Sequence, residues 1–164
     1  MKTTKTILTE LGACPEAVKW AGGKTPKKAW ETCNHGDWLL WVAGKIDIDR
    51  KLIVLAACAC AKTALKYLPV GEDRPRIAIE TAEAWTRGEA TIEQVHAAAD
   101  AAVHAAYHVA DAVANAAFQA AVQAAFHAAY AADAAGRKDM ARIIRKIIPF
   151  SVIKQAIADY EGKA

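Results

Sequence analysis

The sequence is short of the residues on which several kinds of catalysis depend. Ser151 is the only serine among 164 residues, so we do not expect a serine nucleophile. A glycine-rich phosphate loop, a zinc-protease motif and a nucleophile elbow are all absent from the sequence. Cys33 and His35 lie two residues apart, but a cysteine and a histidine at a helix end need not face each other. We therefore predict no catalytic residues and no enzymatic activity.

The sequence also lacks a long apolar run. Its longest strongly apolar stretch, residues 52–61, is about half as long as a membrane-spanning helix. Residues 1–10 contain no apolar core of signal-peptide length. The four cysteines form no Cys-x-x-Cys pair, and we expect reduced thiols that pack mostly as small apolar groups. Together these absences predict a cytoplasmic protein that does not contact a membrane.

Neither sign of charge is in large excess. The 21 basic and 18 acidic residues give a formal net charge of +3, which is too balanced to indicate a nucleic-acid partner. Basic residues gather in two segments, residues 2–28 and 137–146, which we interpret as solvated surface. We expect neither nucleic acid nor a cofactor to bind.

Turn residues and helix caps divide the chain into helices, and no alternating pattern typical of a strand lies between them. Asp37 and Asp49 are predicted to cap the helices that follow them. We expect helices over residues 13–22, 26–33, 38–43, 50–67, 76–86, 139–148 and 151–160.

One segment, residues 91–135, is unusually rich in alanine. Thr91 and Gln94 have the spacing of a capping box, and neither glycine nor proline follows before Gly136. The segment is therefore predicted to form one helix of about 45 residues, or about 65 Å. Its larger side chains recur every eleven residues, close to three helical turns, so they form a ridge on one slowly drifting face. The alanine sides would let neighbouring helices approach closely.

The expected fold is an all-α, single-domain helical bundle around this long alanine-rich central helix. Within residues 1–164 we distinguish a tryptophan-rich helical half (13–91), the long helix (91–135) and C-terminal helices (139–160). The bulkiest side chains of the predicted core are Trp20, Trp30, Trp38, Trp41 and Trp85.

The first part of the ridge is polar, and three interpretations of it are open. It is a partly solvated stripe, a binding surface, or a metal site. A metal site would use Asp100, His104, His108 and Asp111, spaced by four, four and three residues, together with ligands from another helix or water. No convincing partner ligand occurs later in the sequence, so we predict no metal. The candidate binding residues are His96, Asp100, His104, His108 and Asp111.

Tryptophans and an Arg-Pro-Arg motif mark four runs of the sequence, and an alanine-rich segment follows the last of them. The runs are residues 14–20, 27–33, 36–41 and 72–91. This pattern resembles the predicted Imm-5-like immunity proteins of bacteria and phages, over about residues 13–135.

The resemblance implies a non-enzymatic protein-binding module that neutralises a toxin or another effector. It implies no catalytic residues. The alternative is a phage accessory or anti-defence protein that binds a host protein or a small ligand, and neighbouring genes would distinguish the two. An enzyme or metal protein that uses the ridge is a third possibility.

Overall fold

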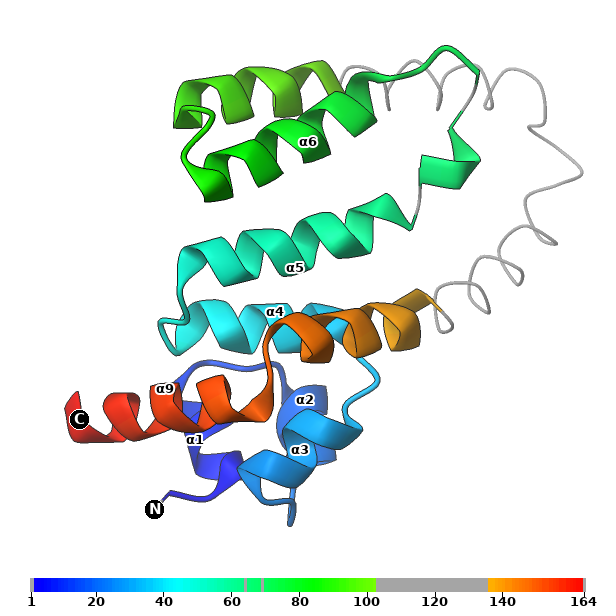
Figure 1. Ribbon diagram of the computed structural model, residues 1–164. Helices are drawn as coiled ribbons and strands as arrows, with labels where there is room; N and C mark the ends of the chain where they lie inside the picture. Colours follow the sequence, from blue (N-terminus) through cyan, green and yellow to red (C-terminus); the bar gives the residue numbers. More distant parts are fainter. Residues whose placement is uncertain (1, 64, 69, 103–135, 164) are drawn as a thin grey trace, which may run out of the picture. The chain divides into compact units, whose positions relative to one another are not determined.

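The computed structural model is helical and contains no strand in the part of the chain that it describes (Figure 1). The described residues are 2–63, 65–68, 70–102 and 136–163. For this part of the chain the all-α fold class is confirmed. Within the same ranges, no helix is long and apolar enough to cross a membrane.

The chain divides into two compact units. Unit 1 consists of residues 1–56 and 137–164, and unit 2 consists of residues 57–136. Their formal charges differ in sign, since unit 1 has 16 basic and 9 acidic residues (+7) and unit 2 has 5 basic and 9 acidic residues (−4). That the whole chain folds as a single domain stays a prediction.

Helix α2 (Pro15–Ala21) begins two residues after its predicted start, and α3 (Pro26–Thr32) begins where the sequence predicts it. A proline stands in the first turn of each helix, where its fixed φ suits the helix and its missing N–H costs no hydrogen bond. The Thr25 side chain also caps α3 by accepting a hydrogen bond from the backbone N–H of Lys28. Both starts are therefore determined by local sequence.

Helix α1 (Thr4–Glu10) has no clear signal in the sequence, because threonine is a weak helix former. A cap and a tertiary contact account for it. The Thr3 side chain accepts a hydrogen bond from the backbone N–H of Thr6 at 3.1 Å. The buried hydroxyl of Thr4 donates to the carbonyl oxygen of Lys24 at 2.6 Å, in the turn between α2 and α3. Packing on this turn thus stabilises a helix that propensity alone does not predict.

Helix α4 (Gly36–Lys45) begins earlier than predicted. His35 occupies the N-cap position and Asp37 lies in the first turn, so the prediction that Asp37 caps this helix is wrong. The Asp37 carboxylate still lies at the end of the helix where the macrodipole favours negative charge. Close packing accompanies the early start, because a Cβ atom at Gly36 would lie only 2.6 Å from Cβ of Met140.

Helical residues 136–147 and helix α9 (Phe150–Lys163) form the C-terminal part of unit 1. The first includes residues 136–138, which precede its predicted start at residue 139, and Pro149 separates the two. Helix α9 contacts α3, so the C-terminal part of unit 1 packs on its N-terminal part (Figure 1). The largest fully buried side chains of the described residues lie in this part: Ile144, Ile148 and Ile153.

Arg145 joins the N-terminal and C-terminal parts of unit 1. Its guanidinium donates hydrogen bonds to the carbonyl oxygens of Cys33, at 2.6 Å, and Trp30, at 3.4 Å. Both carbonyls lie at the C-terminal end of α3, where a helix leaves its last carbonyl groups unpaired and favours a positive charge. Arg145 is therefore placed to stabilise this end of α3.

Replacing Arg145 by alanine is expected to lower the free energy of unfolding by about 1–3 kcal/mol, because two carbonyl groups lose a charged donor. The matched control is Arg142→Ala, since Arg142 is exposed and pairs with Asp139 within the same helix. The control should cost no more than about 0.5 kcal/mol. Urea denaturation followed by tryptophan fluorescence measures both, and equal losses would contradict the role given to Arg145.

Helix α5 (Arg50–Lys62) is capped by Asp49, as predicted, through a hydrogen bond of 2.9 Å from the backbone N–H of Lys51. It ends before the predicted end at residue 67. The backbone N–H of Thr63 bonds to the carbonyl oxygen of Cys60, which tightens the last turn. A short 3₁₀ helix, η1 (Leu65–Tyr67), follows.

Helix α6 (Arg74–Arg87) belongs to unit 2 and begins two residues before its predicted start, with Pro75 in its first turn. It ends one residue after its predicted end at residue 86, and its C-cap is Gly88, which has a φ of 79° in the left-handed region that glycine adopts readily. An ion pair of 2.6 Å between Lys62 and Glu83 links it to the end of α5.

Residues 92–102 are helical and follow the predicted capping box, which is confirmed. The backbone N–H of Thr91 donates to Oε1 of Gln94 at 2.8 Å, and the backbone N–H of Gln94 donates to Oγ1 of Thr91 at 3.3 Å. Residues 103–135 lie outside the described residues, so a single long central helix is not shown. Helices α6 and α9, with 14 residues each, are the longest that the structure describes.

Candidate functional site

Unit 1 contains a cavity of about 480 Å³, lined entirely by residues of that unit. Helices α1 to α4 and their connecting turns supply most of the lining, and α9 adds Ile153 and Ile157. A volume of this size suits a small molecule or a large side chain. The lining is almost wholly apolar, and its bulkiest members are Trp20, Trp30, Trp38 and Trp41.

The tryptophans do not form the core in the way the sequence analysis expects. Trp30 is buried, with an exposed fraction of 4 %. Trp20, Trp38 and Trp41 are half-buried and line the cavity, and Trp85 is half-buried in unit 2. The prediction is therefore wrong for four of the five. The buried side chains of unit 1 are mostly isoleucines and alanines, and not the tryptophans that the sequence analysis expects.

The aromatic side chains of the lining contact one another and His35. Trp20 and Trp38 meet edge to face, with their ring centroids 6.1 Å apart. His35 stacks on Trp38 at a centroid distance of 4.0 Å, and its Nδ1 lies 3.9 Å from Oδ1 of Asp37. Aromatic pairs in such geometries stabilise by about 0.5–1.5 kcal/mol beyond the burial of their area. These contacts hold Trp38 in a defined orientation at the cavity.

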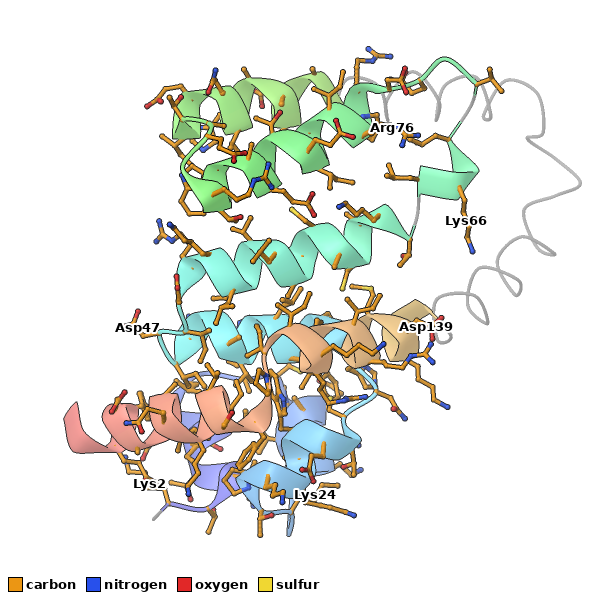
Figure 2. The ribbon with its side chains drawn as sticks, in the orientation of Figure 1. Lys2, Lys24, Asp47, Lys66, Arg76 and Asp139 are labelled. Carbon is orange, nitrogen blue, oxygen red and sulfur yellow. The ribbon has the colours of Figure 1, made fainter. Side chains whose placement is uncertain are left out.

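Two lysines lie near the cavity, but the lining itself contains no basic residue. Nζ of Lys24 lies 4.3 Å from the ring centroid of Trp20, and Nζ of Lys45 lies 5.7 Å from that of Trp41. Figure 2 shows Lys24 on the turn that leads into α3. Neither lysine belongs to the lining, in which Asp37 is the one charged residue. The cavity is therefore an aromatic, apolar space with a single carboxylate.

The Cys33 thiol lines the cavity but is not paired with an imidazole. It donates to the carbonyl oxygen of His35 at 3.6 Å and accepts from the backbone N–H of His35 at 3.4 Å. Burial raises the pKa of this thiol, so it stays protonated near neutral pH. The Cys33 thiol therefore bonds to the backbone of His35 and does not form a nucleophile–base pair with its imidazole.

None of the four cysteines, all of which lie among the described residues, forms a disulfide, as predicted. Cys33, Cys58 and Cys60 are buried, and burial raises the pKa of each thiol. These three pack as small apolar groups, whereas Cys14 is exposed at the edge of the cavity.

The predicted polar ridge is described only at its beginning. His96 and Asp100 are exposed on helical residues 92–102 and, four residues apart, lie on one face. His104, His108 and Asp111 lie outside the described residues. The ridge as a binding surface therefore stays a prediction. In the part of the chain that is described, no three metal-binding side chains come together.

The residues that the structure describes thus define a class of protein, a helical one with an aromatic cavity. A family model, that of the Imm-5 like putative immunity protein, matches residues 41–144. Because the match covers more than half of the chain, the chain belongs to this family, as the resemblance in the sequence implies. Comparisons with curated proteins and with solved structures give no match.

The matched range and the cavity overlap only in part. Residues 41–144 include the second half of α4, all of α5 and α6, and the predicted ridge. Trp20, Trp30 and Trp38 precede this range, and the isoleucines of α9 follow it. The sequence signal for the cavity was the clustering of four tryptophans within residues 20–41, which fits a core equally well.

Proposed function

We propose that this protein is a non-enzymatic module that neutralises a toxin or another effector by binding it. The observation that carries the proposal is the family match over residues 41–144, whose description names immunity. A partner held in a tight complex loses access to its own target, so binding alone is sufficient for neutralisation. A cytoplasmic location belongs to the same proposal.

The chemistry of the cavity supports binding in preference to catalysis. General acid–base catalysis uses a group that exchanges protons readily near the working pH. Burial raises the pKa of the Cys33 thiol, which removes it as a ready nucleophile. The Asp37 carboxylate is more than half exposed, with a side-chain exposure of 56 %, and is not desolvated as a tuned acid or base usually is.

For the surface that contacts the protein partner, we propose the polar ridge of His96, Asp100, His104, His108 and Asp111. The exposure of its first two members supports an accessible face. Unit 2, which contains the ridge, has a formal charge of −4, so the complementary surface of the partner is expected to be basic. Association should then slow as salt is added, because salt screens the steering between exposed charges.

The function is tested by co-expression with the product of a neighbouring toxin gene. Cells that produce both proteins should survive where cells that produce the toxin alone do not, and the two proteins should purify together. If survival is not restored and no complex forms with any neighbouring gene product, the proposal of immunity by binding is wrong.

The ridge is tested separately with the double variant His104→Ala, His108→Ala and a captured partner. Binding should weaken at least about tenfold if both imidazoles contact the partner, since interface residues that matter cost more than about 1 kcal/mol each. Stability should change little, because alanine has the higher helix propensity. His127→Ala, in the same segment but outside the ridge, is the control. Calorimetric titration that gives equal affinities for the double variant and the parent would exclude the ridge while leaving the immunity function standing.

A further inference from the structure

We propose that the tryptophan-lined cavity of unit 1 binds a small organic cation with a compact, methylated ammonium group. This site is distinct from the ridge of unit 2 proposed for the protein partner. It also goes beyond immunity, because a free small molecule and not a protein is the ligand.

The size and lining of the cavity suit a small ligand. Its volume of about 480 Å³ falls within the range usual for small-molecule sites, which are mostly apolar and aromatic with few polar groups. Trp20, Trp38 and Trp41 are half-buried, so part of each side chain remains open to contact. Trp30 is buried and therefore contributes a fixed part of the wall.

The lining favours a positive charge over a negative one. The face of an indole ring carries negative charge density, and tryptophan is the aromatic side chain that attracts cations best. Asp37 is the one charged lining residue, and the raised pKa keeps the Cys33 thiol neutral. The lining therefore offers an ammonium group indole rings and one carboxylate, and it contains no lysine, arginine or histidine.

Two rings of the lining already have a lysine ammonium group close to them. Lys24 places its ammonium 4.3 Å from the centroid of Trp20, and Lys45 places its own 5.7 Å from the centroid of Trp41. Both lysines lie outside the lining, so they leave the cavity itself without a cation. A quaternary ammonium is less strongly hydrated than a lysine ammonium, and aromatic sites recognise such groups in many proteins.

Part of the positive charge of unit 1 lies close to the lining, since Lys24 and Lys45 lie near Trp20 and Trp41, and Arg145 donates to the backbone of Cys33. The charge of +7 is spread over the whole unit. At physiological salt, exposed charges more than about 8 Å apart are largely screened from each other. The contacts of the ligand with the indole rings and Asp37 therefore need to exceed the repulsion from these three nearby groups only.

Three probes of matched shape test the proposal: choline, 3,3-dimethyl-1-butanol and 3,3-dimethylbutanoate. All three carry the same trimethyl head, which is positive in choline, uncharged in the alcohol and attached to a carboxylate in the acid. Titration followed by tryptophan fluorescence and by ligand-observed NMR should show choline binding about five- to thirtyfold more tightly than the alcohol. The carboxylate should bind most weakly because Asp37 repels it.

One variant and its control test whether choline binds in this cavity. Asp37→Asn should weaken choline binding about two- to fivefold while leaving the alcohol unaffected, as expected for a partly exposed ion pair. Asp47→Asn is the control: Asp47 lies in the turn between α4 and α5, outside the lining, and asparagine tolerates its positive φ of 63° (Figure 2). Circular dichroism of both variants verifies that the fold is retained.

Three kinds of result would contradict the proposal. Equal affinities of choline and the alcohol, or a preference for the carboxylate, would overturn the assignment of a cation. Failure of all three probes to saturate any signal would overturn the site. An equal effect of Asp37→Asn and Asp47→Asn would place choline somewhere other than this cavity.

Discussion

Replacing Ile144 by alanine is expected to lower the free energy of unfolding by about 2–5 kcal/mol. The side chain has no exposed surface and lies on the buried face of helical residues 136–147. Ala141 and Ile148, three residues before it and four after, are buried on the same face. The substitution removes three carbon atoms from a closely packed site and leaves a hole that its neighbours cannot fill completely. Because a domain is stable by only about 5–15 kcal/mol, this is a large fraction of the total.

Two further variants make this prediction specific. Ile144→Val removes one methyl group and should cost about 0.5–1.5 kcal/mol. Ile143→Ala removes the same atoms as Ile144→Ala from a half-buried position in the same helix, and should cost clearly less than Ile144→Ala. Urea denaturation gives the free energies. If Ile143→Ala and Ile144→Ala were equally costly, the assignment of the buried face would be wrong.

Two glycine substitutions in α4 are expected to change stability in opposite directions. Gly36→Ala should destabilise by about 1–3 kcal/mol through overpacking. A Cβ atom at this position would lie 2.6 Å from Cβ of Met140 and 3.0 Å from the backbone nitrogen of Ala141. A backbone cannot rotate away as the end of a flexible side chain can, so the two helices must move apart.

Gly44→Ala is the matched control in the same helix. No heavy atom lies within 4 Å of a Cβ at Gly44, and its φ is not positive. Alanine should therefore stabilise by up to about 1 kcal/mol, because it loses less conformational freedom on folding. Thermal unfolding followed by circular dichroism should show a lower Tm for Gly36→Ala and a higher Tm for Gly44→Ala. A lowered Tm for both would mean that helix α4 does not tolerate a side chain at either position.

Local sequence predicted several helix boundaries of this protein correctly. Pro15 and Pro26 mark the first turns of α2 and α3, and Gly88 ends α6. The reciprocal hydrogen bonds of Thr91 and Gln94 follow from their spacing alone. These features involve groups within about one helical turn of each other, so the neighbouring residues contain all the information that they need. The resemblance to the family was likewise visible in short sequence segments that contain tryptophans or the Arg-Pro-Arg motif.

Features that depend on distant parts of the chain were not predictable in the same way. Helix α1 is stabilised by the contact of Thr4 with Lys24, and the start of α4 lies where Gly36 packs on Met140. Neither contact leaves a pattern in its own segment, because the partner is 20 residues away in the first case and more than a hundred in the second.

The cavity shows the same division between sequence and tertiary structure most clearly. The sequence alone determined that four tryptophans lie within residues 20–41, on helices whose starts it largely predicts. Whether a tryptophan packs in a core or lines an open space depends on how five helices meet, because burial is decided by all the neighbours of a side chain together. Only the tertiary structure placed Trp20, Trp38 and Trp41 around a cavity and built a core mostly of isoleucine and alanine.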